Sequence, residues 1–362
     1  MRLLIAGGGT GGHLFPGMAV AEEVVRRGGQ VLFVGTSRGL EARAVPAAGY
    51  ALELLEVSGL ARVGLSATLR SLVRLPKAFL RSLAILRRFR PDVILGVGGY
   101  ASGPMVLAAA LWRYPTAIQE QNSVPGITNR ILARLVRVVM VAFEETREFF
   151  PPRKIEILGN PVRHKLVAAL TDGGVAGAAK QDARILVVGG SQGARGVNDL
   201  CLAAFELLAK NGSLPAVVHQ TGPSDLERCG ERYRALGVGD RVEVRSFIDD
   251  MAAEYRRASL VVARAGALTL AELAIAGRPA ILIPLPTAAD DHQRKNAARF
   301  AEAGAALVLD QGASTGAQLA QLLGELGADS GRRQGMEAAM RGLARPHAAA
   351  ALVDRLEALA KR

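Results

Sequence analysis

Three glycine-rich stretches carry the residues best suited to phosphate binding. They are Gly7-Gly-Gly-Thr-Gly-Gly-His13, the segment from Gly96 to Gly103, and the segment from Gly189 to Arg195. Each follows an apolar run that suits a buried strand, and a glycine turn between a strand and a helix points backbone N–H groups and the helix N-terminus at an anion. Close packing of a helix on a strand is the alternative for any one stretch. Two of them in one half of the chain favour a diphosphate site.

The first stretch also fits the dinucleotide-binding pattern Gly7-x-Gly9-x-x-Gly12. That interpretation requires an acidic residue at the end of the second strand to hold a ribose, whereas the segment 30–35 is followed by Thr36-Ser37-Arg38. The missing acid argues against NAD or FAD. A dinucleotide-dependent oxidoreductase or a non-catalytic nucleotide-binding module remains the alternative to a phosphate-binding enzyme of another class.

Polar side chains follow several other apolar runs. His13 has the ordinary pKa range of a general base at neutral pH, or it donates a hydrogen bond to phosphate, and the residues alone leave both roles open. A glutamate in the segment 264–272 could accept hydrogen bonds from two sugar hydroxyls, or it lies on a solvated helix face. Apart from His292 beside the second pair, the aspartate pairs at 249–250 and 290–291 lack a third ligand at a recognised spacing, and the sequence has no HExxH, CxxC, Walker A or GxSxG motif. We expect no metal site.

Composition indicates a two-domain α/β enzyme. The chain has 362 residues, of which 50% are hydrophobic and 4% aromatic, and this length exceeds that of most single-core domains. The net charge of +12 predicts an anionic partner such as nucleic acid, a membrane surface or a phosphorylated substrate. Cys201 and Cys229 stand in no pattern and suggest free thiols. We expect neither a signal peptide nor a membrane-spanning segment.

The chain starts the same fold twice, because 2–12 and 184–194 both consist of a basic residue, four apolar residues and a glycine loop. This repeat predicts α/β domains at 1–159 and 160–344, each a doubly wound parallel sheet, and a final helix within 345–362. Ligands of such folds bind at the carboxyl ends of the strands. We expect strands at 3–6, 31–34, 93–96, 116–119 and 138–142, and at 185–188, 216–220, 242–246, 260–263, 280–283 and 306–308.

A basic stretch runs from Val57 to Pro91. It contains eight Arg or Lys residues and no acidic residue, with Leu and Phe interleaved at spacings that a helix would sort into a basic and an apolar face. Contact with an anionic membrane is the functional interpretation, and an ordinary surface helix is the alternative. Because the stretch has no Tyr or Trp for base stacking, we do not expect nucleic acid as a partner.

The ordered motifs resemble the MurG family of bacterial transferases (glycosyltransferase family 28) over essentially the whole chain. The matching motifs are those at 7–13, 98–104, 120–122, 126–129, 159–163, 189–194, 247–251 and 266–269. The resemblance implies a GT-B fold of two Rossmann-like domains facing a cleft. It also implies inverting transfer of N-acetylglucosamine from UDP-N-acetylglucosamine to the C4 hydroxyl of the N-acetylmuramoyl group of lipid I, which forms lipid II for peptidoglycan synthesis. It further implies that the C-terminal helix packs on the first domain and that the enzyme binds peripherally to the cytoplasmic face of the inner membrane.

The resemblance also assigns roles to residues by motif position. Catalysis would involve His13 as the base, with Glu120 and Tyr100. The donor would contact Thr10, Gly11, Gly12, Asn122, Arg163, Ser191, Gln192, Ile248, Ala267, Leu268, Thr269, Glu272 and Gln293. The acceptor would contact Gly9, Thr10, Gly11, His13, Gly99, Tyr100, Ser102 and Asn129. No cofactor and no metal are implied.

Two positions depart from the family pattern. Gln119 stands where members often have His, so this position cannot be an obligatory base. His292-Gln293 replaces a usual Gln-Gln pair, which leaves the role of position 292 open. Another GT-B transferase acting on a membrane lipid, or a UDP-sugar epimerase of similar fold, is the alternative among enzymes.

Overall fold

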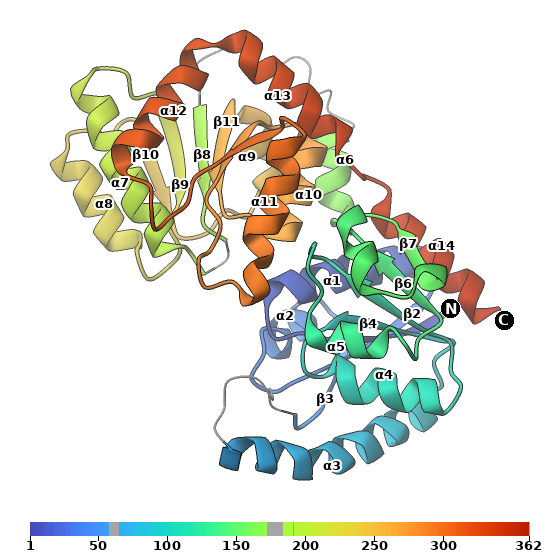
Figure 1. The fold of residues 1–362 in the computed structure, drawn as a ribbon. Coiled ribbons are helices and arrows are strands. Elements are labelled where there is room, and N and C mark those ends of the chain that lie inside the picture. The colour runs from blue at the N-terminus through green and yellow to red at the C-terminus, as the bar shows by residue number, and fades with distance from the viewer. Residues whose placement is uncertain (58–64, 172–183, 191, 362) are drawn as a thin grey trace. The chain divides into compact units, whose positions relative to one another are not determined.

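The computed structural model describes residues 1–57, 65–171, 184–190 and 192–361, which form two compact units (Figure 1). Unit 1 comprises Met1–His164 and Pro346–Arg362, and unit 2 comprises Lys165–Arg345. Residues 58–64 of the basic stretch lie outside the described residues, as does Ser191. Among the described helices, none combines the length and the apolar character needed to cross a membrane.

Unit 1 contains a seven-stranded parallel sheet in the order β3-β2-β1-β4-β5-β6-β7. Its strands are β1 (Arg2–Gly7), β2 (Gln30–Gly35), β3 (Ala51–Leu54), β4 (Val93–Gly98), β5 (Thr116–Glu120), β6 (Val138–Val141) and β7 (Ile155–Ile157). Alternate residues of the central strands enter two separate cores, as Leu3 and Leu4 do. The doubly wound prediction is confirmed. Strands β3 and β7 were not predicted, because these short edge strands are only partly buried.

The helices of unit 1 cover both faces of this sheet. They are α1 (Gly11–Arg26), α2 (Glu41–Ala47), α3 (Leu65–Phe89), α4 (Ser102–Leu111), α5 (Ile127–Leu132) and α14 (Ala348–Ala360), with 3-10 turns at Glu144–Phe149 and Pro152–Lys154. Leu352 and Leu356 of α14 lie in the same core as Val20 of α1. An ion pair of 2.6 Å between Arg27 Nη1 and Asp354 Oδ1 fastens the two helices.

Unit 2 repeats the design with a six-stranded parallel sheet in the order β10-β9-β8-β11-β12-β13. Its strands are β8 (Arg184–Val188), β9 (Ala216–Gln220), β10 (Val242–Arg245), β11 (Leu260–Ala263), β12 (Ala280–Leu282) and β13 (Ala306–Val308). All six strands predicted for this half of the chain are present. Both cysteines are buried free thiols in this unit.

Most helices of unit 2 connect its strands, and several begin just after a strand ends. They are α6 (His164–Thr171), which joins the units, α7 (Arg195–Lys210), α8 (Leu226–Ala235), α9 (Met251–Arg257), α10 (Ala267–Ala276), α11 (His292–Glu302), α12 (Gly316–Ala328) and α13 (Ser330–Gly342), with a 3-10 turn at Ala289–Asp291. Val187 and Val262 face a core shared with Phe205 of α7 and Leu323 of α12. The sheet thus places the loops after β8, β11 and β12 side by side.

Candidate functional site

His13 lies where the first two glycine stretches meet. Strands β1 and β4 are neighbours, and Gly7 pairs with Gly98 across an irregular register. Thr10, the N-cap of α1, places its Oγ1 3.2 Å from His13 Nδ1. The imidazole packs so closely over Gly98 that a Cβ at that position would overlap the ring. The sheet and the helix therefore fix the histidine at the carboxyl ends of the strands.

The predicted acceptor residues around His13 differ in exposure. Gly9, Thr10 and Gly12 are exposed and Gly11 is half-buried, so the turn before α1 is open to solvent. Tyr100 is 52% exposed and Gly99 is half-buried. Ser102, in contrast, is completely buried, and its hydroxyl lies against Gly96. In this structure Ser102 packs α4 on the sheet and does not face solvent.

Glu120, at the end of β5, is also buried, with 1% of its surface exposed. Its Oε1 accepts a hydrogen bond from the Asn122 backbone N–H at 3.1 Å, and its Oε2 accepts one from Asn129 Nδ2 at 2.8 Å. The Gly126 N–H donates to the same Oε2 at 3.3 Å. Burial raises the pKa of the Glu120 carboxyl, and these donors act in the opposite direction. The carboxylate thus organises the loop between β5 and α5.

Gln119 belongs to a neighbouring set of buried amides. Its Nε2 donates to Asn160 Oδ1 at 3.3 Å, and Gln121 Nε2 donates to the Val97 carbonyl at 2.9 Å. Gln121 Nε2 also contacts Gln119 Oε1. These bonds join the end of β5 to the end of β4 and to the segment that follows β7. The glutamine at 119 therefore has a structural role in this chain.

In unit 2 the third glycine stretch packs against the loop that follows β9. A Cβ at Gly193 would overlap the Thr221 carbonyl, and one at Gly222 would overlap the Gln192 carbonyl. Gln220 Nε2 donates to the Gly190 carbonyl at 3.3 Å. The side chain of Gln192 is exposed, so it remains accessible beside this fixed turn.

The remaining predicted donor residues lie around α10, which begins after the Gly266 N-cap. Ala267, Leu268 and Thr269 form its first turn. Glu272 is half-buried on the next turn, and its Oε2 accepts a hydrogen bond from the Tyr255 hydroxyl at 3.0 Å. This bond holds the carboxylate in one orientation at the end of the sheet.

For three predicted donor residues, the structure gives less direct support for a ligand contact through the side chain. Ile248 is 2% exposed, so its side chain belongs to the core and a ligand would reach only its main chain. Gln293 accepts a hydrogen bond from the Leu285 N–H at 3.0 Å and so braces the loop after β12. Arg163 is exposed and lies in unit 1, two residues before unit 2 begins at Lys165.

Arg264 is a buried residue to which the sequence assigned no role. Its Nη1 donates to the carbonyls of Ile283 at 2.9 Å and Pro284 at 3.0 Å, and its Nη2 donates to Gln311 Oε1 at 2.5 Å. Burial lowers the pKa of this guanidinium. The side chain thus ties together the ends of β11, β12 and β13. Its only signal in the sequence is a basic residue directly after a buried strand.

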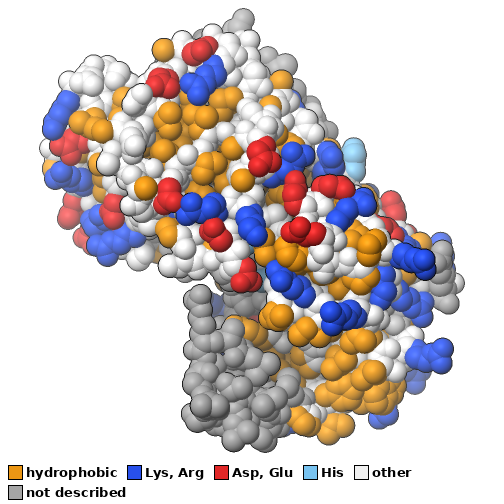
Figure 2. Space-filling model, viewed as in Figure 1, with side chains coloured by type: hydrophobic (Ala, Val, Ile, Leu, Met, Phe, Trp, Pro, Cys, Tyr) orange, Lys and Arg blue, Asp and Glu red, His pale blue; other side chains and the backbone are white. Residues whose placement is uncertain are grey.

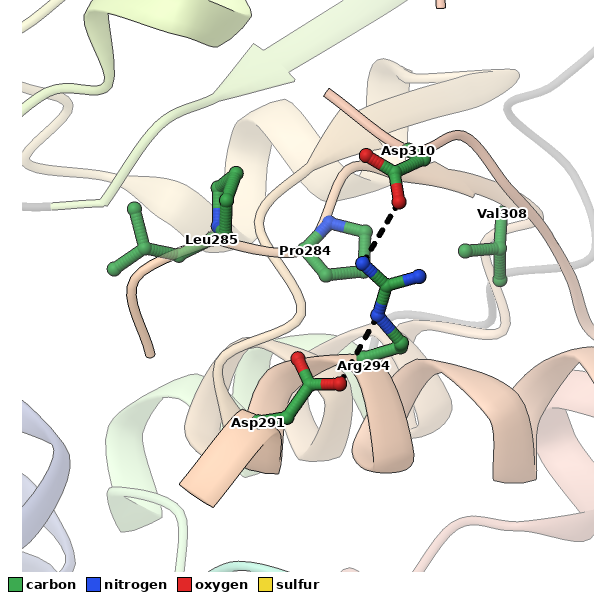
Figure 3. A pocket seen from close by; sticks show the side chains of 7 residues that line it. Pro284, Leu285, Asp291, Arg294, Val308 and Asp310 are labelled. Atoms are coloured by element: carbon green, nitrogen blue, oxygen red, sulfur yellow. Dashed lines mark hydrogen bonds and ion pairs between the residues drawn. The ribbon is translucent and has the colours of Figure 1, made fainter. Parts of the chain in front are cut away.

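A small pocket at the ends of β12 and β13 is not suited to an anion. Arg294 lies between Asp291 and Asp310 in this pocket, and Pro284, Leu285 and Val308 also line it (Figure 3). Arg294 Nε is 3.1 Å from Asp291 Oδ2, and its Nη2 is 2.7 Å from Asp310 Oδ2. The two carboxylates offset the guanidinium charge and raise its pKa. Among the described residues, no group of three or more His, Cys, Asp or Glu side chains is arranged to hold a metal ion.

Comparison with known proteins places both halves of the chain in one family. The model described as "Glycosyltransferase family 28 N-terminal domain" matches residues 3–141, and the one described as "Glycosyltransferase family 28 C-terminal domain" matches residues 184–352.

Two similar bacterial proteins have the same name and activity. A protein of Myxococcus xanthus (strain DK1622) is 51% identical over 356 residues, which are 98% of this chain and 92% of that protein. A protein of Anaeromyxobacter dehalogenans (strain 2CP-C) is 49% identical over 364 residues, covering 100% of this chain and 94% of that protein. Both are named UDP-N-acetylglucosamine--N-acetylmuramyl-(pentapeptide) pyrophosphoryl-undecaprenol N-acetylglucosamine transferase.

Solved structures agree with these relatives. The crystal structure of Acinetobacter baumannii MurG matches with a TM-score of 0.79 and 31% identity, covering 98% of this chain and 99% of that chain. A putative UDP-N-acetylglucosamine 2-epimerase from Listeria monocytogenes matches with a TM-score of 0.67 at 12% identity, which shows a shared fold alone.

Proposed function

The chain belongs to glycosyltransferase family 28, and we propose that it transfers N-acetylglucosamine from UDP-N-acetylglucosamine to N-acetylmuramyl-(pentapeptide) pyrophosphoryl-undecaprenol, or lipid I. It is a glycosyltransferase of peptidoglycan synthesis with the GT-B fold. The observation that carries this conclusion is the 51% identity to a transferase so named along 98% of the chain.

Unit 2 is the proposed donor half. The first turn of α10, with Ala267, Leu268 and Thr269, offers a helix N-terminus to the diphosphate. Glu272, held by Tyr255, suits the two ribose hydroxyls, since a carboxylate accepts two hydrogen bonds. Motif position adds Gln192 and Gln293 of unit 2 and Ser191, which lies outside the described residues. It also adds five donor contacts from unit 1, namely Thr10, Gly11, Gly12, Asn122 and Arg163.

Unit 1 is the proposed acceptor half, and His13 is the proposed base. The imidazole would take the proton of the acceptor C4 hydroxyl as the oxygen attacks the anomeric carbon, and the bond from that carbon to the UDP oxygen would break. Attack from the face opposite the leaving group inverts the anomeric centre. Glu120 is better suited to positioning its loop than to touching the sugar, because its two oxygens already accept hydrogen bonds.

The lipid substrate requires access to a membrane surface, and unit 1 has an apolar patch for it. Six large hydrophobic side chains on α3, α4 and α5, and on residues just after α4 and α5, are between 45% and 66% exposed, namely Leu80, Leu111, Trp112, Ile127, Ile131 and Leu135. Figure 2 shows hydrophobic side chains gathered on this unit with Lys and Arg at their margin. We propose that this patch enters the headgroup region at the cytoplasmic face of the inner membrane.

The positive charge of α3 contributes less to this contact than its sequence suggests. Arg81 and Arg88 both contact Glu53, and Lys77 Nζ lies 3.1 Å from Glu56 Oε2. Acidic residues just before the basic stretch therefore offset part of its charge. Apolar insertion and electrostatic attraction to anionic lipid therefore both contribute to the proposed membrane binding.

The reaction itself tests the proposal. Purified protein is incubated with radiolabelled UDP-N-acetylglucosamine and a lipid I analogue, and the products are separated by chromatography. We expect a β-1,4-linked disaccharide that forms only when both substrates are present. An epimerised UDP-sugar, or transfer to diacylglycerol but not to the lipid I analogue, would contradict it.

A further inference from the structure

Glu41, the first residue of α2, is a buried carboxylate in contact with the first glycine stretch. It is 1% exposed, although it follows β2 by six residues and belongs to a short surface helix. Its Oε2 accepts a hydrogen bond from the Gly9 N–H at 2.7 Å. Its Oε1 accepts two from Thr36, one from the backbone N–H at 2.8 Å and one from the hydroxyl at 2.9 Å. The carboxylate is therefore fully engaged by the loops after β1 and β2.

The surrounding backbone is shaped to admit this side chain. A Cβ at Gly8, Gly35 or Gly39 would overlap the carboxyl group or the Cγ atom of Glu41. Gly35 at the end of β2 and two loop glycines thus leave the space that the glutamate fills. A buried carboxylate is costly unless it is hydrogen-bonded, and here three donors converge on it.

We propose that Glu41 is a positioning residue that fixes the first glycine stretch and, through it, the orientation of His13. Gly9 is held by the carboxylate, and the next residue, Thr10, is both the N-cap of α1 and the hydrogen-bond partner of His13 Nδ1. A shift of Gly9 would move Thr10 and the imidazole with it. This inference rests on the proposed function for the role of His13.

The same contact also argues against a dinucleotide at the glycine pattern of unit 1. A pyrophosphate in such a fold needs the N–H groups of the loop and a close approach to its glycines. Glu41 already accepts from the Gly9 N–H, and its charge disfavours a second anion at that depth. An acceptor diphosphate is left with the outer part of the turn, at Thr10 to Gly12.

The test compares Glu41→Gln with a matched control. Glutamine fills the same volume, and its carbonyl can still accept from Thr36, but its NH2 group cannot accept from Gly9. We expect kcat to fall by about ten- to a hundredfold, as small displacements of catalytic groups do, with the Kd for UDP unchanged. Amide hydrogen exchange at Gly9 should accelerate.

The control variant is Glu23→Gln. Glu23 is a carboxylate on α1 that is 4% exposed, and it pairs with Arg26 and Arg27 away from the glycine loop. It should leave kcat and Gly9 exchange unchanged.

A double-mutant cycle separates positioning from general destabilisation. In a His13→Ala background, Glu41→Gln should cause almost no further loss of kcat, because its effect acts through His13. Wild-type kcat in Glu41→Gln, or a full independent loss added to that of His13→Ala, would overturn the proposal. If the wild-type protein shows no transfer, the proposed function fails, and unchanged Gly9 exchange in Glu41→Gln would separately refute the hydrogen bond.

Discussion

His219 should make unit 2 sensitive to mild acid. This histidine is completely buried on β9, with Nδ1 2.9 Å from the Tyr233 hydroxyl and Nε2 3.1 Å from Asn198 Oδ1. Asn198 Nδ2 donates to the Thr221 carbonyl and to Asp225, so its Oδ1 accepts from His219 Nε2–H. In the neutral imidazole with this tautomer, Nδ1 accepts a hydrogen bond from the Tyr233 hydroxyl.

Burial lowers the pKa of His219 to about 3, and the nearby Asp225 carboxylate opposes this shift only in part. Because the pKa is lower in the folded state than in the unfolded state, protonation favours unfolding. The stabilisation is complete above the unfolded pKa of about 6.5 and decreases by about 1.4 kcal/mol per pH unit as the pH falls below it. Between pH 7 and pH 5, the free energy of unfolding should fall by about 2 kcal/mol from this group alone.

Urea unfolding followed by circular dichroism measures this effect in wild type and in His219→Gln. The variant loses stability at every pH, but the difference between the two proteins should shrink by about 2 kcal/mol from pH 7 to pH 5. His164→Gln, at an exposed histidine, is the control and should follow the wild-type curve. Parallel pH curves for wild type and His219→Gln would refute the assignment of a buried neutral imidazole.

Three further changes test the proposed site. His13→Ala should lower kcat by about a hundredfold or more while the Kd for UDP-N-acetylglucosamine stays the same, and near-normal turnover would exclude it as the base. Glu272→Ala should weaken UDP binding by about tenfold in calorimetric titration, because hydrogen bonds to a charged group are lost, and an unchanged Kd would remove its ribose role. Trp112→Ser should reduce binding to anionic vesicles by about 1 kcal/mol without changing turnover of a water-soluble acceptor, and undiminished binding would exclude the patch from membrane contact.

The central strands could be predicted because both faces of each sheet are covered. Continuous apolar runs such as Leu3 to Ala6 are typical of strands buried on both sides. The edge strands β3 and β7 lack that signal, since half-exposed residues such as Glu53 interrupt their apolar character. The repeat of strand, glycine loop and helix was sufficient to predict two similar units.

The candidate site was less predictable, because its residues depend on contacts between distant loops. No sequence motif around Glu41 predicts its burial, and its contact with Gly9 exists only because β1 and β2 are adjacent. The catalytic role of Glu120 stays a prediction, and its burial among donors up to nine residues away has no signal in the sequence. Arg264 was visible in the sequence as a polar residue after a strand, yet its carbonyl partners belong to a loop after β12. Such burial follows from tertiary packing, which residue spacing does not encode.

The central claim is that the nucleotide of the donor binds to unit 2. Hydrogen–deuterium exchange with UDP alone tests it most directly. UDP lacks the transferred sugar, so it reports only the nucleotide site. We predict that UDP protects peptides that cover 264–272 in unit 2 more strongly than peptides that cover 7–13 in unit 1, and that NAD protects neither. Protection of 7–13 without protection of 264–272, or stronger protection by NAD than by UDP, would contradict the assignment of the nucleotide to unit 2.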